Sequence, residues 1–171
     1  MNYLIIAAVV LMVIAPIFWF MPSPEIKRQM TMRDRAMQLG LQVKICDLPQ
    51  TYRARVRQEY VEKGVVYRLH WVKPLQPRDQ FCQILLREDD SVSVPKSAVD
   101  DLMTASLSAM PAAVMALEYA TAGVAVYWRE RGSVAEVEAI AQGLQRLQTG
   151  ILAVRERLSS EASDELDQGQ R

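Results

Sequence analysis

The chain has 171 residues, and its 20 basic and 20 acidic side chains give a formal net charge of zero at pH 7. A neutral chain carries no global field that attracts nucleic acid, so a nucleic-acid partner is not expected. The length is enough for one self-sufficient core without disulfide or metal staples. The two cysteines, Cys46 and Cys82, fit the free thiols of a reducing compartment.

The N-terminal segment 1–22 contains an uncharged apolar run from Tyr3 to Met21. At the α-helical rise, this run reaches roughly the 30 Å hydrocarbon thickness of a bilayer, and Trp19 and Phe20 suit an interfacial aromatic belt. A cleaved signal peptide is the alternative, but no basic residue precedes the run and bulky residues end it. The sequence therefore predicts a transmembrane anchor over residues 1–22.

Residues 23–40 are expected to form a basic juxtamembrane helix, because Pro24 suits its first turn and Gly40 its end. Cationic side chains follow the apolar run and none precedes it, so the positive-inside rule predicts a single-pass protein of the bacterial inner membrane. Its N-terminus would lie outside and its C-terminal domain in the cytoplasm. The expected membrane-surface residues, which either contact lipid head groups or only set the topology, are Lys27, Arg28, Arg33 and Arg35.

The first half of the expected cytosolic domain, which spans residues 41–158, contains three predicted strands. Residues 41–45 alternate apolar and polar side chains, and residues 65–72 and 81–87 have strand composition. The polar connection over residues 50–64 is expected to be a solvated loop. Its basic and aromatic side chains, which would otherwise extend the basic patch or contact RNA, are Tyr52, Arg53, Arg55, Arg57 and Tyr60.

The second half is predicted to contain a helix, a hairpin and a longer helix. A capping box that begins at Ser97 predicts a helix to about Ala109. The β-branched and aromatic residues around Gly123 favour a hairpin. A second capping box begins at Ser133, and apolar residues then recur every three or four positions to Leu158, which predicts a helix of about 26 residues.

Together these elements predict an α+β fold, in which an N-terminal transmembrane helix precedes an α-β-β-β-α-β-β-α domain with a mostly antiparallel sheet. Residues 159–171 are expected to be a disordered acidic tail. The element order resembles that of the type III secretion chaperone-like fold, whose members bind other proteins and often dimerise. This resemblance implies a protein-binding role and assigns no site.

Two further resemblances involve the N-terminal half. The stretch FMPSPEIKRQMTMRDRA is similar to the start of the small auxiliary subunit of the bacterial preprotein translocase, although LQVKICDLPQTYRARV lacks the glycines that follow in that family. The whole chain resembles uncharacterised single-pass inner-membrane proteins of Proteobacteria. They share a proline-serine-proline and basic stretch after the anchor, and a Leu-Gly-Leu-x-Val exit, here residues 39–43. Neither resemblance implies an activity.

The residues that carry reactive groups are few. His70 is the only histidine and could form a thiol–imidazole pair with Cys46 or Cys82. Strand alternation instead places His70 at the surface, and the cysteines fit small core residues. No ligand pair has metal-site spacing and no glycine-rich phosphate loop occurs, so we expect no catalytic residue, metal or cofactor. A membrane-bound thiol enzyme is kept as an alternative.

The long C-terminal helix is the second expected interaction surface. Its apolar stripe follows heptad positions, and the helix is longer than the strands it would cover, so its distal part should overhang the sheet. We expect a protein partner or a second copy of the chain to bind there, through Ile151, Val154 and Leu158. The sequence thus predicts an interaction or accessory module of an inner-membrane complex, with a lipid or envelope-stress sensor as a further alternative.

Overall fold

The computed structural model describes residues 23–72, 82–87 and 97–168, together with Tyr3, Ile6, Leu11 and Met12, and it describes side chains as far as Ser160. These residues form a five-stranded, fully antiparallel sheet with the spatial order β1-β2-β5-β4-β3. The strands are β1 (Gln42–Asp47), β2 (Lys63–His70), β3 (Cys82–Leu86), β4 (Val114–Ala120) and β5 (Gly123–Trp128).

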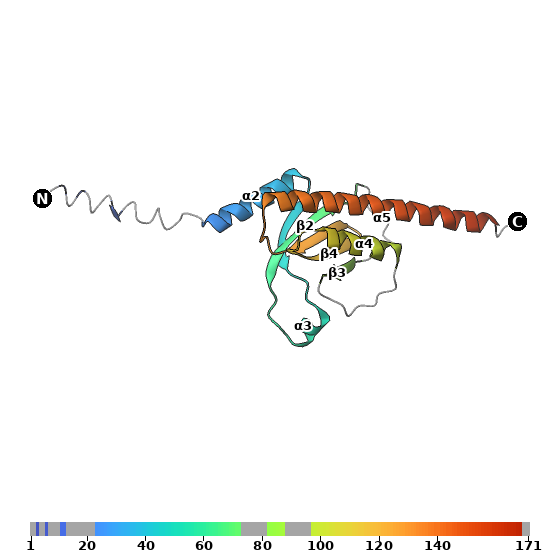
Figure 1. The fold of residues 1–171 in the computed structure, drawn as a ribbon, viewed down its shortest axis with the longest axis horizontal. Coiled ribbons are helices and arrows are strands. Elements are labelled where there is room, and N and C mark those ends of the chain that lie inside the picture. Colours follow the sequence, from blue (N-terminus) through green and yellow to red (C-terminus); the bar gives the residue numbers. More distant parts are fainter. Residues whose placement is uncertain are drawn as a thin grey trace.

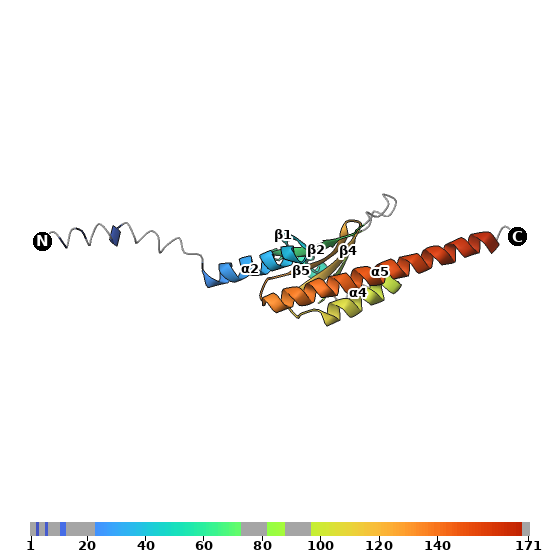
Figure 2. The same cartoon turned by 90° about the horizontal axis from the view of Figure 1, so that it is seen from above.

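Three helices cover one face of this sheet (Figure 2). They are α2 (Pro24–Gln38), α4 (Ala98–Ala109) and α5 (Val134–Gln168). The short helix α3 (Tyr52–Val56) lies apart from them, below the sheet in Figure 1. The α+β fold with an antiparallel sheet is therefore shown. Within the described domain, the element order differs from the predicted one by the insertion of α3 between β1 and β2.

The main correction concerns the predicted transmembrane helix. Within the residues that the structure describes, no helix is both long enough and apolar enough to cross a membrane. Helix α2 has only 15 residues, and α5, although it has 35, carries charged side chains along its length. Apart from the four residues named above, the segment 1–22 lies outside the described residues. The membrane-spanning element and the single-pass inner-membrane location are thus not supported.

The core lies between the sheet and the three helices. Alternate strand residues, such as Tyr67 on β2 and Trp128 on β5, face the helices, and their rings meet edge to face with centroids 5.4 Å apart. The predicted apolar stripe of α5 is the face that covers them. Its fully buried members are Val137, Ile140, Leu144, Leu147 and Ile151.

A partly buried ion pair joins α2 to Glu130, which follows β5. Arg33 Nε donates to Glu130 Oε1 at 2.8 Å, and Tyr67 Oη donates to the same oxygen at 2.9 Å. Glu130 is only 2% exposed, and its φ of 53° lies in the left-handed region. Burial and the neighbouring carboxylate raise the pKa of Tyr67. Gly40, whose φ is 80°, follows α2 as predicted and turns the chain into β1.

Candidate functional site

The connection between β1 and β2 forms a projecting arm, residues 48–62, which contains α3 (Figure 1). The arm has its own hydrogen bonds, as a compact Ω-loop does. Its base is closed by the Leu48 amide, which donates to the Glu62 carbonyl at 2.8 Å. The Thr51 hydroxyl caps α3 by accepting from the Ala54 amide at 3.2 Å. A stretch expected to be solvated loop is therefore an ordered structural element.

Leu48 fixes the arm to the body. Its side chain is 4% exposed and lies against Gly64, the second residue of β2. A side chain at Gly64 would collide with Leu48, and its Cβ would lie 2.8 Å from the Trp128 carbonyl oxygen. The absence of a side chain at Gly64 is what lets the arm pack this closely onto the sheet.

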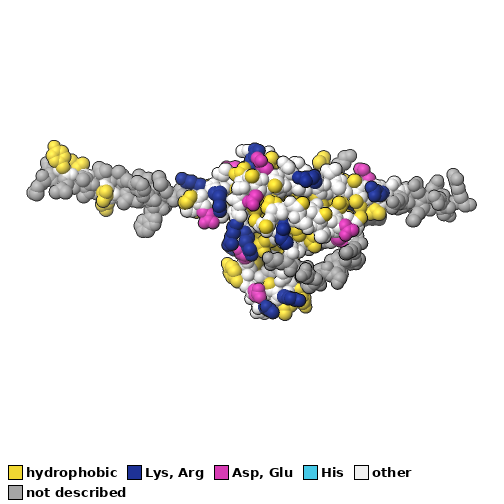
Figure 3. Space-filling view, in the orientation of Figure 1, with side chains coloured by type: hydrophobic (Ala, Val, Ile, Leu, Met, Phe, Trp, Pro, Cys, Tyr) yellow, Lys and Arg dark blue, Asp and Glu magenta, His cyan; other side chains and the backbone are white. Residues whose placement is uncertain are grey.

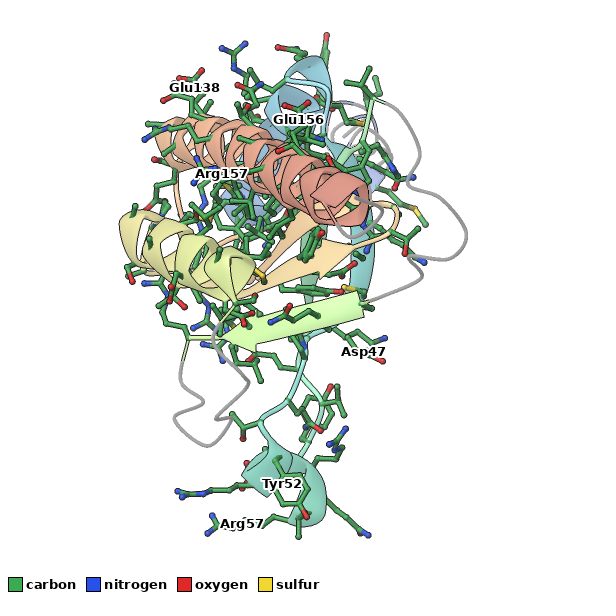
Figure 4. The ribbon with its side chains drawn as sticks, turned by 90° about the vertical axis from the view of Figure 1, so that its right-hand side faces the viewer. Asp47, Tyr52, Arg57, Glu138, Glu156 and Arg157 are labelled. Atoms are coloured by element: carbon green, nitrogen blue, oxygen red, sulfur yellow. The ribbon has the colours of Figure 1, made fainter. Side chains whose placement is uncertain are left out.

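The outer surface of the arm exposes large apolar and aromatic side chains. Tyr60 is 86% exposed, Tyr52 is 62% exposed and Val56 is 61% exposed. Figure 4 shows Tyr52 and Arg57 on the arm, well separated from the helices of the body. Tyrosine and arginine are enriched among the residues that dominate the energy of protein–protein interfaces. The arm thus presents residues suited to contacts beyond its own fold.

Positive charge accompanies these side chains, as the dark-blue groups on the arm in Figure 3 show. The Arg55 guanidinium lies 5.9 Å from the centre of the Tyr52 ring, and Arg57 forms an exposed ion pair with Glu59 at 3.8 Å. In the part of the chain that the structure describes, Arg53 and Arg55 have no carboxylate within ion-pair distance.

A pocket of about 250 Å³ lies at the base of the arm. Its lining joins the arm to the ends of β3, β4 and β5, so four separate parts of the chain build it. The lining mixes apolar and cationic side chains. The apolar side chains include Leu48, Pro49, Leu86, Ala113 and Val114, and the charged ones are Glu62, Arg87, Arg129 and Arg131.

The three arginines of the pocket differ in availability. Arg87 Nη2 donates to the carbonyls of Leu107 and Met110 at 2.7 and 3.2 Å, and so satisfies the C-terminal end of α4. Arg129 pairs with Glu62 at 2.7 Å. Arg131 is exposed, and no described carboxylate lies within ion-pair distance of it. Arg131 is therefore the cation of this pocket best placed to meet an external anion.

The predicted membrane-surface residues divide into two groups. Lys27 and Arg28 are exposed near the start of α2. Arg33 binds Glu130, and Arg35 binds Glu138 at 2.6 Å. These two carboxylates lie 97 and 103 residues further along the chain, so the local sequence pattern does not reveal the pairs.

The predicted partner-binding residues divide as well. Ile151 is fully buried in the core of its own chain, Val154 is half-buried, and Leu158 is 56% exposed. Beyond Ile151, α5 continues past the sheet (Figure 2) to Gln168, ten residues past the expected end at Leu158. The predicted overhang is present, and its exposed large apolar side chains in the described part include Leu152 and Leu158.

The residues of the thiol-enzyme alternative lie apart. Cys46 and Cys82 lie on β1 and β3, the two opposite edges of the sheet, which strand spacing places roughly 19 Å apart. The His70 ring contacts Gln42 Oε1 at 2.9 Å and the Ala122 carbonyl at 3.0 Å. Burial raises the pKa of both thiols, which lowers their reactivity at neutral pH. The structure therefore does not assemble a thiol–imidazole pair.

Sequence reasoning missed a polar cluster on the sheet face opposite the helices. Arg68 Nη2 bonds Glu118 Oε1 at 2.6 Å, and Tyr127 Oη donates to Oε2 of the same carboxylate. Glu118 is 3% exposed, and burial, with the carboxylate beside it, raises the pKa of Tyr127. The strand register brings these residues together across β2, β5 and β4. Strand alternation alone could have assigned each one to a face, but not its partners.

Among the described residues, no group of three or more His, Cys, Asp and Glu side chains could hold a metal ion. The arm and its pocket are therefore the candidate site that rests on the most observations. Comparison with known proteins gives no match: no family model fits the chain, and no curated protein and no solved structure matches it. The resemblances drawn from the sequence thus stay predictions, and the site has to be interpreted from its own chemistry.

Proposed function

We propose that this chain is a protein-interaction module that binds its partner through the arm site, defined as residues 48–62, the pocket at their base and Arg131. The observation that carries the proposal is the exposure of Tyr52, Val56 and Tyr60 on an element that projects from the sheet. Each of these side chains has apolar surface that a partner would remove from water.

The order of the arm supports the proposal. The Leu48–Glu62 hydrogen bond closes its base, and Gln50 Nε2 donates to the Glu59 carbonyl across it at 3.0 Å. A loop that is already fixed loses less conformational entropy when it binds, so more of the contact energy appears as affinity.

The chemistry of the pocket favours recognition over proton transfer. Its cations are guanidinium groups, which donate hydrogen bonds but stay protonated near neutral pH. Arg87 and Arg129 are already occupied by contacts that hold the fold, and they shape the pocket. Such a site suits a carboxylate or carbonyl oxygen beside an apolar side chain.

Site-specific photo-crosslinking tests the proposal. A photoreactive residue placed at Tyr60 should give a discrete protein adduct in cells. The same residue placed at Val72, which is 94% exposed and lies beyond the opposite end of β2, should not. With the adduct partner purified, Tyr52→Ser/Tyr60→Ser should weaken its binding to the full-length protein at least tenfold, a loss of about 1.4 kcal/mol.

The matched control is Val72→Ser, which also removes an exposed apolar side chain and should leave the affinity unchanged. Equal adducts from both positions, or an unchanged affinity of the double tyrosine variant, would show that the arm is not the binding element.

A further inference from the structure

The C-terminal segment 159–171 has a chemistry that complements the arm site. It contains four acidic residues, a single basic one at its end, and one large apolar residue, Leu166. In a chain with no net charge, this segment concentrates negative charge, while the arm carries three arginines within five residues. Opposite charges on two separate surfaces favour their encounter.

The arm site has unused capacity for such a segment. Arg53, Arg55 and Arg131 have no carboxylate partner within the described residues. The adjacent pocket of about 250 Å³ has an apolar lining that includes Leu48, Leu86 and Val114. The site therefore combines cations without partners with a recess for an apolar side chain.

The course of α5 makes binding within one copy unfavourable. The helix runs without a break from Val134 to Gln168, and its C-terminal end points away from the sheet and from the arm (Figures 1 and 2). To reach its own arm, the segment would have to interrupt a continuous helix and lose its hydrogen bonds. The same helix carries residues 159–168 of the segment past the sheet (Figure 2).

We infer that the arm site binds the acidic C-terminal segment of a second copy of this chain. Carboxylates of the segment pair with Arg53, Arg55 and Arg131, and Leu166 enters the pocket. The inference rests on the proposed function and names its partner. Because the contact joins two different surfaces, it links copies head to tail, and the assembly closes only when the rotation between copies permits a ring.

Sedimentation of the full-length protein tests this inference. Mild detergent keeps the apolar run of residues 3–21 from causing non-specific association. At about 0.05 M salt the average mass should rise with protein concentration. At about 0.5 M salt the average mass should be lower at every protein concentration, because salt screens exposed charges. Arg53→Glu/Arg55→Glu and Asp164→Lys/Glu165→Lys should each weaken self-association at least tenfold.

The decisive measurement is made on a mixture of the two charge-reversal variants. Each variant should bind itself at least tenfold more weakly, but the two together again present opposite charges at both contacts, so the mixture should associate. Arg28→Glu/Arg146→Glu changes the net charge by the same amount at exposed positions outside the arm site and should associate normally. A synthetic peptide of residues 159–171 should compete with self-association.

Self-association that is insensitive to both reversals, or a mixture that stays monomeric, would overturn the inference. The proposed function has a separate fate. If the photoreactive residue at position 60 crosslinks to a different protein and the peptide of residues 159–171 does not bind, the arm is a binding element but its partner is not a second copy. If position 60 gives no specific adduct and neither reversal has an effect, both proposals fail.

Discussion

Two pairs of arginines, alike in sequence, have opposite fates in this molecule. Arg33 and Arg35 on α2 both bind carboxylates of distant segments, whereas Arg53 and Arg55 on the arm have no such partner in the described part of the chain. The sequence pattern indicated that the α2 pair would contact lipid head groups or only set the topology, and that the arm pair would lie in a solvated loop. A basic cluster is available for binding only when no carboxylate of its own fold reaches it.

The largest expected effect comes from removing the charge that Arg33 binds. Glu130→Gln keeps the size of the side chain, which is 2% exposed, but leaves the Arg33 guanidinium, which is 29% exposed, beside a neutral amide. Breaking a buried pair on one side typically costs about 3 kcal/mol or more, so the free energy of unfolding should fall by about 3 kcal/mol. Urea unfolding of the full-length protein, followed by circular dichroism, measures the change.

Tyr67→Phe is a useful companion variant, since it removes only the hydroxyl that donates to Glu130 and leaves the ion pair in place. Its loss should be near 1 kcal/mol. Equal effects of the two variants would mean that the charge of Glu130 contributes little to stability, and that the Arg33 pair resembles the unpaired arm arginines in its energetic weight.

A smaller effect is expected at the second pair of α2. Arg35 and Glu138 are 39% and 41% exposed, and Figure 4 shows Glu138 on the outer side of α5. Pairs of this kind contribute about 0.2 to 1 kcal/mol and weaken with salt. Glu138→Gln should therefore lower the melting temperature slightly at low salt and leave it unchanged at about 0.5 M salt. A loss as large as that of Glu130→Gln would contradict the ranking by burial.

The smallest effect on stability should come from the arm. Arg53→Ser/Arg55→Ser removes exposed side chains without carboxylate partners in the described residues, so the free energy of unfolding should change by no more than about 0.5 kcal/mol. The same change should weaken partner binding. Thermal unfolding and the sedimentation assay, performed on one preparation, separate these two effects, and a strongly destabilised variant would show that the arm serves the fold.

Much of the fold could be predicted because its signals are local. Ser97 and Asp100 form the predicted capping box, with both reciprocal bonds, at the start of α4. The β-branched and aromatic residues of β4 and β5 form the predicted hairpin at Gly123. The α5 stripe was correctly placed, although the helix continues beyond its predicted end. In each case, residues within a few positions of one another determine the structure.

The site could not be predicted in the same way, because its parts meet only through the tertiary fold. The pocket needs the arm, the end of β3, the start of β4 and the segment after β5 at one end of the sheet. Ile151 matched an interface residue by its spacing, but the same spacing also describes a core face, and burial decided between them. The membrane anchor was inferred from the apolar composition of residues 1–22. Within the described residues, no helix is long enough and apolar enough to cross a membrane.

The length of α5 fixes both the distance and the direction at which the C-terminal segment leaves the domain. From Ile151 to Gln168 the helix adds roughly 25 Å at 1.5 Å per residue, and each residue turns the exit direction by about 100°. The helix therefore presents the C-terminal segment at a fixed distance from the sheet and at a fixed angle to it. Deleting or inserting seven residues in this part of α5 would change the distance and nearly keep the angle. Deleting or inserting two would turn the same charges toward another side of the molecule.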